Sequence, residues 1–145
     1  MLKQLILLLL ITASTNIYAQ CTTCNSLSEA LKNPEQVTAI KINSMQNDTV
    51  LKEFPQEISK FINLRILWLS SHEIKSINKD VCKLENLKSL SLAENHLKDL
   101  PECIYEMKNL KEIILLNNDF TEKAKTAIKA RFAKSNHDIK VEFDM

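Results

Sequence analysis

The sequence contains no glycine at all, although an average protein contains roughly 7%. This absence excludes functions that depend on glycine-rich turns: phosphate-binding loops, dinucleotide-binding G-x-G-x-x-G turns and the G-x-S-x-G elbow of serine hydrolases. Aromatic residues are also scarce, at 6%, so the core has to be built mainly from aliphatic side chains. With 45% hydrophobic and 26% charged residues, the composition is that of one folded domain.

An excess of charge of either sign is lacking as well. The 19 Lys and Arg residues almost balance the 18 Asp and Glu residues, which leaves a net charge of +1. A nearly neutral chain is not expected to bind a polyanion or an anionic membrane by bulk electrostatics. We therefore expect no nucleic-acid partner.

The apolar run near the start is too short to cross a bilayer, which takes about 20 residues. Lys3 precedes the run Leu5–Ile11, and Ile17-Tyr18-Ala19 follows it, which is the order of features in a secretory signal peptide. Residues 1–19 are therefore predicted to be a signal peptide, and a buried helix is disfavoured because the run has no polar side. The mature chain is then expected in the secreted, periplasmic or cell-envelope fraction, without a transmembrane segment.

A lipidated N-terminus is a minor alternative. Bacterial lipoproteins carry a lipidated cysteine directly after the signal, and Cys21 lies close to that position. Their cysteine follows a small residue, whereas Cys21 follows Gln20. This difference favours an unmodified chain over anchoring through Cys21.

A repeat of 23 residues runs through the middle of the chain. The hexapeptides 64–69, 87–92 and 110–115 align, and each begins 23 residues after the previous one. Further columns share this spacing; they are Phe54/Ile77/Leu100, Ile58/Val81/Ile104, Phe61/Leu84/Met107, Ile74/Leu97/Phe120 and His72/Asn95/Asn118. So many matched columns at one spacing indicate a structural repeat.

Each repeat predicts a short strand and a helical return. The apolar residues of the hexapeptides alternate with other residues, which places them on one face of a strand. In the linking segments apolar residues are three apart, which predicts helical or 3₁₀ turns. An earlier, irregular repeat contains Val37, Ile40 and Ile42 and has a longer connection, so about four strands are expected.

The pattern L-x-x-L-x-L-x-x-N-x-L resembles that of leucine-rich repeats, and the chain is similar to secreted bacterial leucine-rich-repeat proteins. The resemblance implies a short right-handed α/β solenoid. A parallel sheet would form its concave face, helical and 3₁₀ turns its convex face, and caps would close both ends. The predicted parts are an N-terminal cap at 20–36, repeats at 37–120 and a helix–strand cap at 121–145.

Caps and bends can be placed on particular residues. Ser26 and Glu29 have capping-box spacing, and Thr121 can cap a helix that reaches about Ser135. The buried side of that helix is expected to contain Ala124, Ala127, Ile128 and Phe132, followed by a strand through Ile139, Val141 and Phe143. In the structural column His72, Asn95 and Asn118, the two asparagines are expected to turn inward and bond backbone groups. His72 departs from this pattern: it can donate and accept a bond, but its bulk is expected to distort the first turn. Without glycine, asparagines are expected to supply left-handed bends; they are Asn63, Asn86, Asn95, Asn109, Asn117 and Asn118.

Four cysteines, an even number, favour disulfides in an exported chain. They are Cys21, Cys24, Cys82 and Cys103. Three pairings are open, and the last two cysteines fall on adjacent coils. The C-x-x-C pair also has the form of a redox motif, but it lies outside any βαβ unit. A four-cysteine zinc site would need a second such pair, so no metal or other cofactor is expected.

The predicted concave face offers the candidate binding residues. Trp68 is the only tryptophan, and the small Ser91 beside it should leave its ring accessible. Aromatic side chains are enriched in binding hot spots, although strand propensity also accounts for apolar residues there. The candidate ligand-binding residues are Lys41, Ile66, Trp68, Ser91, Glu112, Ile114 and Leu116.

No constellation of catalytic residues is evident, because the three histidines are scattered without a metal-binding or triad spacing. The sequence therefore favours an exported, non-catalytic module that binds a protein or peptide through the concave face of a monomer or weak homo-oligomer. A structural or self-associating protein of the cell envelope is the alternative.

Overall fold

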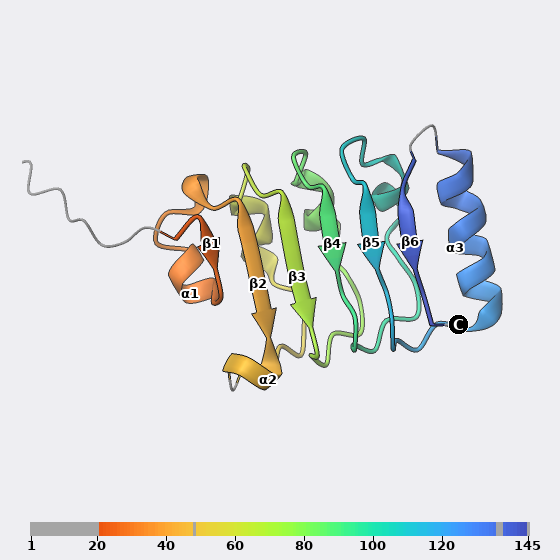
Figure 1. Ribbon diagram of the computed structural model, residues 1–145, viewed down its shortest axis with the longest axis horizontal. Coiled ribbons are helices and arrows are strands. Elements are labelled where there is room, and N and C mark those ends of the chain that lie inside the picture. Colours follow the sequence, from red (N-terminus) through yellow and green to blue (C-terminus); the bar gives the residue numbers. More distant parts are fainter. Residues whose placement is uncertain (1–20, 48, 136–137, 145) are drawn as a thin grey trace, which may run out of the picture.

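The computed structural model describes residues 21–47, 49–135 and 138–144. Six parallel strands lie side by side in chain order and form one open sheet (Figure 1). The strands are β1 (Thr23–Cys24), β2 (Ala39–Asn43), β3 (Ile66–Ser70), β4 (Ser89–Ser91), β5 (Glu112–Ile114) and β6 (Lys140–Glu142). The predicted signal segment 1–19 lies outside the described residues.

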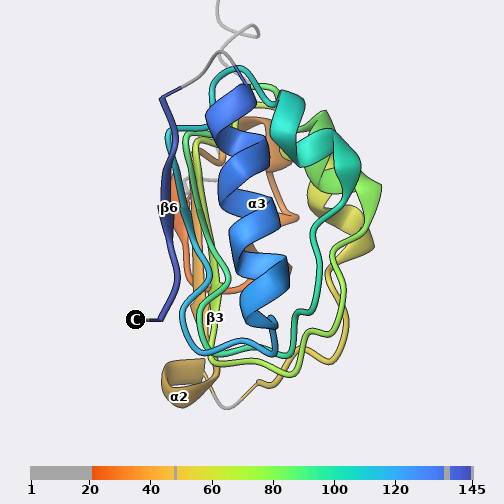
Figure 2. The same cartoon turned by 90° about the vertical axis from the view of Figure 1, so that its right-hand side faces the viewer.

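The 3₁₀ helices η2 (Gln56–Lys60), η3 (Lys79–Lys83) and η4 (Glu102–Glu106) carry the chain back between strands on the other side of the core (Figure 2). The other helices are α1 (Leu27–Ala30), η1 (Pro34–Gln36), α2 (Ser44–Asn47) and α3 (Glu122–Lys134). A parallel sheet with helical and 3₁₀ return segments confirms the predicted α/β solenoid. The strand β1 was not expected from the sequence.

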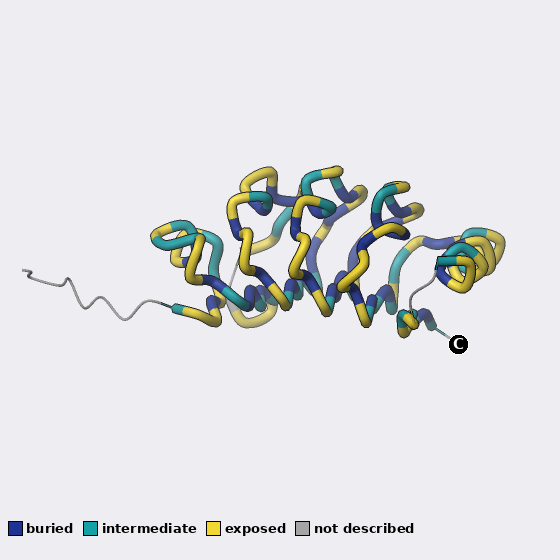
Figure 3. The backbone as a smooth tube through the Cα atoms, turned by 90° about the horizontal axis from the view of Figure 1, so that it is seen from above, coloured by how far each residue is buried: buried dark blue, intermediate teal, exposed yellow. Residues whose placement is uncertain are grey.

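The core lies between the sheet and the return segments, and neighbouring coils bury it jointly. Leu67 pairs in register with Leu90, which pairs with Ile113, and all three are fully buried. Buried and exposed residues alternate along each coil (Figure 3). A single coil cannot cover its own inward apolar side chains, so each coil depends on its neighbours to bury them.

Helix α3 closes the C-terminal end of the core. Its N-cap Thr121 accepts a hydrogen bond from the Ala124 N–H, and its C-cap is Ser135, as predicted. Phe132 is buried against Tyr105 of the last coil, with ring centroids 4.7 Å apart. The expectation that Ala127 lies on the buried side was wrong, because this residue is exposed.

Two asparagines, Asn95, which is buried, and Asn118, which is partly buried, join successive coils at the bends after the strands. The Asn95 Oδ1 accepts the Ile74 N–H at 3.1 Å, and the Asn118 Oδ1 accepts the Leu97 N–H at 2.9 Å. Their Nδ2 groups donate to carbonyls of their own and the preceding coil, which are those of Leu69, Leu92 and Ala93 for Asn95 and of Leu92, Leu115 and Leu116 for Asn118. The asparagines of the inward column therefore form a ladder of side-chain hydrogen bonds between coils.

His72 takes the equivalent place in the first of these bends. Its Nδ1 accepts the Leu51 N–H at 3.4 Å, as the asparagine oxygens accept theirs. Its Nε2 is buried and makes no hydrogen bond within the described residues. Burial lowers the pKa of His72 below its ordinary value, and the Ile42 backbone offsets only part of this effect. The neutral imidazole is thus the form that fits the bend.

We expect the free energy of unfolding to fall as the pH drops below about 6.5, the ordinary histidine pKa. The unfolded chain binds the proton first because the pKa of His72 is lower in the folded state. The contribution of His72 to the free energy of unfolding is therefore complete above that pH. It is lost as the pH falls through the lower pKa that His72 has in the folded state. The free energy of unfolding, measured with urea at several pH values from 8 to 5, should depend less steeply on pH in His72→Asn than in the unmodified chain. An unchanged slope would contradict this assignment.

One position in each bend has a left-handed backbone. Ser71, Glu94 and Asn117 have φ angles of 62°, 57° and 52°, and each directly precedes a member of the inward column. Glycine would suit this position, yet the chain has none. The prediction that asparagines in general supply the left-handed bends was wrong, because Asn117 is the only one of the six with positive φ.

We expect Glu94→Gly to raise the free energy of unfolding by about 0.5–1 kcal/mol, because glycine adopts positive φ without steric cost. The hydrogen bond that Glu94 loses from Ser71 is exposed and contributes little. Lys98→Gly is the matched control, since Lys98 is exposed and its φ is not positive. The Lys98→Gly variant should have a lower free energy of unfolding than the unmodified chain, and urea denaturation measures both variants. A loss of stability in Glu94→Gly would contradict the argument.

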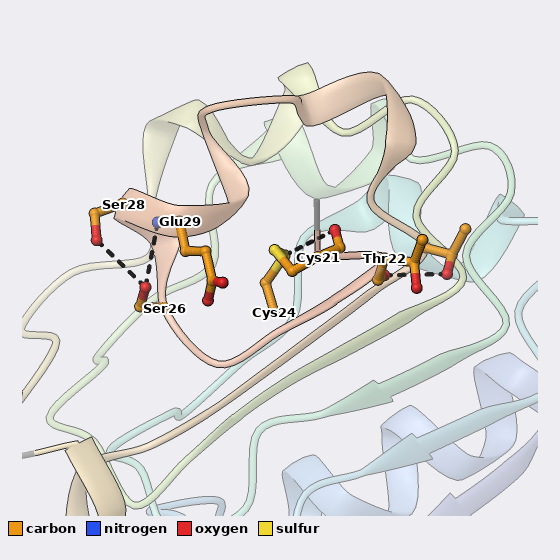
Figure 4. The surroundings of a disulfide bond; sticks show 7 residues. Cys21, Thr22, Cys24, Ser26, Ser28 and Glu29 are labelled. Atoms are coloured by element: carbon orange, nitrogen blue, oxygen red, sulfur yellow. Dashed lines mark hydrogen bonds between the residues drawn. A yellow bond between two sulfur atoms is a disulfide. The ribbon is translucent and has the colours of Figure 1, made fainter. Parts of the chain in front are cut away.

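Two disulfides resolve the cysteine pairing. Cys21 bonds Cys24, with Cα atoms 5.3 Å apart, at the strand that begins the sheet (Figure 4). Cys82 of η3 bonds Cys103 of η4, with Cα atoms 6.0 Å apart. The second bond joins two adjacent coils on the side away from the sheet. No cysteine among the described residues is free.

Replacing both Cys82 and Cys103 by serine should lower the free energy of unfolding by about 3 kcal/mol. The disulfide closes a loop with a sequence separation of 21, and such a loop restricts the unfolded chain by about this amount. The Cys21→Ser/Cys24→Ser pair is the control, because its separation of 3 predicts a smaller loss of about 2 kcal/mol. Guanidinium unfolding measures both, and an equal or reversed order would contradict the prediction.

Candidate binding surface on the outer face of the sheet

The outer sheet face consists of the strand residues that point away from the core. Strand register sets these residues in rows across the sheet. One row is Ala39, Ile66, Ser89, Glu112 and Lys140, and the next is Lys41, Trp68, Ser91, Ile114 and Glu142. This surface is the face that the sequence predicts to be concave.

Trp68 is held in place on this face by two neighbours. The Lys41 Nζ lies over its ring, 4.1 Å from the centroid. Its Nε1–H donates to the Ser89 Oγ at 3.1 Å. The indole is therefore half-buried, with a cation over its ring and its N–H already bonded.

The polar contacts continue across the following strands. The Ser89 hydroxyl donates to the Glu112 Oε2 at 3.1 Å. The Glu112 Oε1 lies 3.7 Å from the Lys140 Nζ, which also pairs with Glu142. The Glu142 carboxylate raises the pKa of Lys140, mainly through their hydrogen bond. A chain of contacts thus runs from β2 to β6 and orders these side chains before any partner binds.

Apolar side chains border the middle of the face. Ile66 on β3, Ile114 on β5 and Leu116 just beyond β5 are all half-buried. Between them β4 carries Ser89 and Ser91, so small side chains lie between larger ones. Apolar area flanked by ordered polar groups is the composition of many protein-binding surfaces.

The strand register places the predicted residues of β2 to β5 on this face, with Leu116 two positions after Ile114. Ser91 differs from expectation, because it is only 6% exposed and its hydroxyl is bonded to the Ser70 hydroxyl at 3.1 Å. The Ser91 side chain therefore packs within the sheet surface and offers little area for contact with a partner. Lys140 and Glu142 were missed because residues 121–145 were assigned to the cap. The alternation of Ile139, Val141 and Phe143 could have placed them outward.

The connection after β2 adds a projection beside this face. Here α2 forms one helical turn that extends past the lower edge of the sheet (Figures 1 and 2). The Met45 N–H donates to the Asn43 Oδ1 at 2.9 Å, and Ser44 bonds the Ser71 carbonyl. Met45 is 78% exposed, the most exposed of the large hydrophobic residues described. The longer connection therefore adds exposed apolar surface beside the sheet.

Among the described residues, no group of three or more His, Cys, Asp or Glu side chains is placed to hold a metal ion. None of the helices in the described part combines the length and apolarity needed to cross a membrane.

Comparison with known proteins supports the fold assignment. Residues 62–120 match the family model described as Leucine rich repeat. A leucine-rich-repeat protein of Leptospira interrogans has a similar solved structure, with a TM-score of 0.56 and 28% sequence identity. The match covers 74% of this chain and 24% of that protein, so the chain spans about a quarter of its length. The architecture is that of an α/β leucine-rich-repeat solenoid.

Internalin C2 of Listeria monocytogenes is also similar, with a TM-score of 0.47 and 15% identity over 84% of this chain and 67% of the other. No curated protein matches the chain.

Proposed function

We propose that the protein binds a protein or peptide partner through the outer sheet face, centred on Trp68. Leucine-rich-repeat solenoids commonly use the extended face of their sheet for binding. The observation that carries the proposal is the ordered set of contacts around Trp68, with Lys41 over its ring and Ser89 at its N–H. An aromatic side chain fixed before binding loses little conformational entropy when a partner arrives.

The proposed activity is binding without catalysis, in an exported protein. Support for export comes from the signal-like segment 1–19 and from the two disulfides, which persist in oxidising compartments. Support for binding without catalysis comes from the groups on the outer sheet face. Glu112 pairs with Lys140, and Trp68 bonds Ser89. Because these groups are engaged with one another, they act as a preformed recognition surface.

Trp68→Ala should weaken partner binding by about 2 kcal/mol or more, the usual loss at a hot spot, while the fold is kept. Peptides selected from a displayed random library on the unmodified chain serve as probes, and calorimetry measures their affinity. Ile62→Ala is the matched control, because Ile62 is 54% exposed and precedes the strand. It should leave the affinity unchanged.

Unchanged affinity in a folded Trp68→Ala variant would overturn the proposed site. Loss of cooperative unfolding in that variant would show instead that Trp68 belongs to the core. Light scattering of the unmodified chain separates hetero-binding from self-association: a stable oligomer that Trp68→Ala dissolves would identify the outer sheet face as a contact between copies.

A further inference from the structure

A row of cations lies where three successive strands begin. Arg65, Lys88 and Lys111 each directly precede a strand, and all three are exposed. The Lys88 N–H donates to the Arg65 carbonyl and the Lys111 N–H to the Lys88 carbonyl, both at 2.8 Å. These bonds set the three residues side by side at the strand spacing of about 4.8 Å. We call these three residues the basic edge.

The positive charges of the basic edge are not neutralised within the molecule. Among the described residues, none of the three side chains forms an ion pair with a carboxylate. The neighbouring Glu112 is occupied by Ser89 and Lys140. Folding therefore leaves three adjacent cations for an external anion.

A second row, of amides, runs beside the basic edge. Asn63, Asn86 and Asn109 each lie two positions before one of its cations and are exposed. Their Nδ2 groups donate to carbonyls of the preceding coil, which are those of Glu35, Ile62 and Glu85, at 2.8, 2.9 and 2.8 Å. Within the described part of the chain, their Oδ1 atoms accept no hydrogen bond. Each coil thus presents one fixed amide oxygen and one cation.

The net charge of +1 describes the chain as a whole and not the basic edge, where three cations lie side by side. At the opposite edge acidic and basic residues are mixed, because Glu73, Glu94 and Asp119 lie among Lys75 and Lys98. Attraction of a polyanion therefore depends on the three adjacent cations. The whole-chain balance of charge does not exclude such a ligand.

We propose that the basic edge binds a linear anionic polysaccharide that lies across the strands. Carboxylate or sulfate groups of successive sugars pair with the cations, and sugar hydroxyls donate to the asparagine oxygens. Polyphosphate has no hydroxyl groups along its chain to donate to those oxygens. The site is separate from the outer sheet face and stands independently of the peptide-binding proposal.

The test measures binding of the whole chain to polygalacturonate, which carries carboxylates, and to heparin, which also carries sulfates. Calorimetry is performed at about 50 mM and about 300 mM NaCl, where screening of charge is weak and strong, respectively. Binding should weaken as the salt concentration rises. The triple variant Arg65→Gln/Lys88→Gln/Lys111→Gln should bind at least about tenfold more weakly. Binding of one polysaccharide and not the other would identify which acidic group is recognised.

Matched variants separate a specific site from general charge. Lys52→Gln/Lys123→Gln/Lys134→Gln makes the same change in net charge at exposed lysines elsewhere and should keep the affinity within about twofold. Glu85→Gln removes an exposed acid three positions before Lys88 and should strengthen binding. Asn86→Ala should weaken polysaccharide binding, and thermal unfolding confirms that each variant is folded.

Three results would overturn the proposal. The first is no binding to either polysaccharide at low salt. The second is an equal loss in the two triple variants, which would show general charge attraction. The third is equally tight binding of polyglutamate or polyphosphate, which would show that sugar hydroxyls play no part.

Discussion

Burial between neighbouring coils is the constraint on which the whole structure depends. A single coil has one row of inward side chains and no second layer to cover it, so the row finds its cover in the coils before and after. Leu67, Leu90 and Ile113 meet in this way in adjacent strands. The end coils lack one neighbour, and the buried Phe132 of α3 supplies apolar cover at the C-terminal end. Regular positions for binding residues on the outer sheet face follow from this stacking.

Polar bonds between coils fix the register that apolar packing alone would leave loose. Asn95 and Asn118 bond backbone groups of two coils at the bends after the strands, while Asn63, Asn86 and Asn109 bond the preceding coil from outside. Buried amides require partners, so a coil that slipped by one residue would lose these bonds. The outer side chains inherit this order, which is why contacts such as Lys41 over Trp68 can be set before a partner arrives.

The repeated parts of this chain could be predicted from sequence because one spacing was sampled three times. The cap helix was also predictable, since Thr121 and the apolar side of α3 follow general rules of helix capping. Features without a repeated signal were not: β1 pairs through only two residues, Thr23 and Cys24, and the contact of Trp68 with Ser89 depends on side-chain geometry. The left-handed position was predicted only at Asn117, because Ser71, Glu94 and Asn117 share no residue type.

The link between Cys82 and Cys103 has a mechanical consequence. In a solenoid pulled from its two ends, coils peel away one after another because each is held only by its neighbours. The disulfide spans a sequence separation of 21, and that stretch of chain cannot extend while the bond is intact. It withholds roughly 70 Å of contour length. Under tension the oxidised molecule would therefore stop short of full extension, with two central coils still tied together.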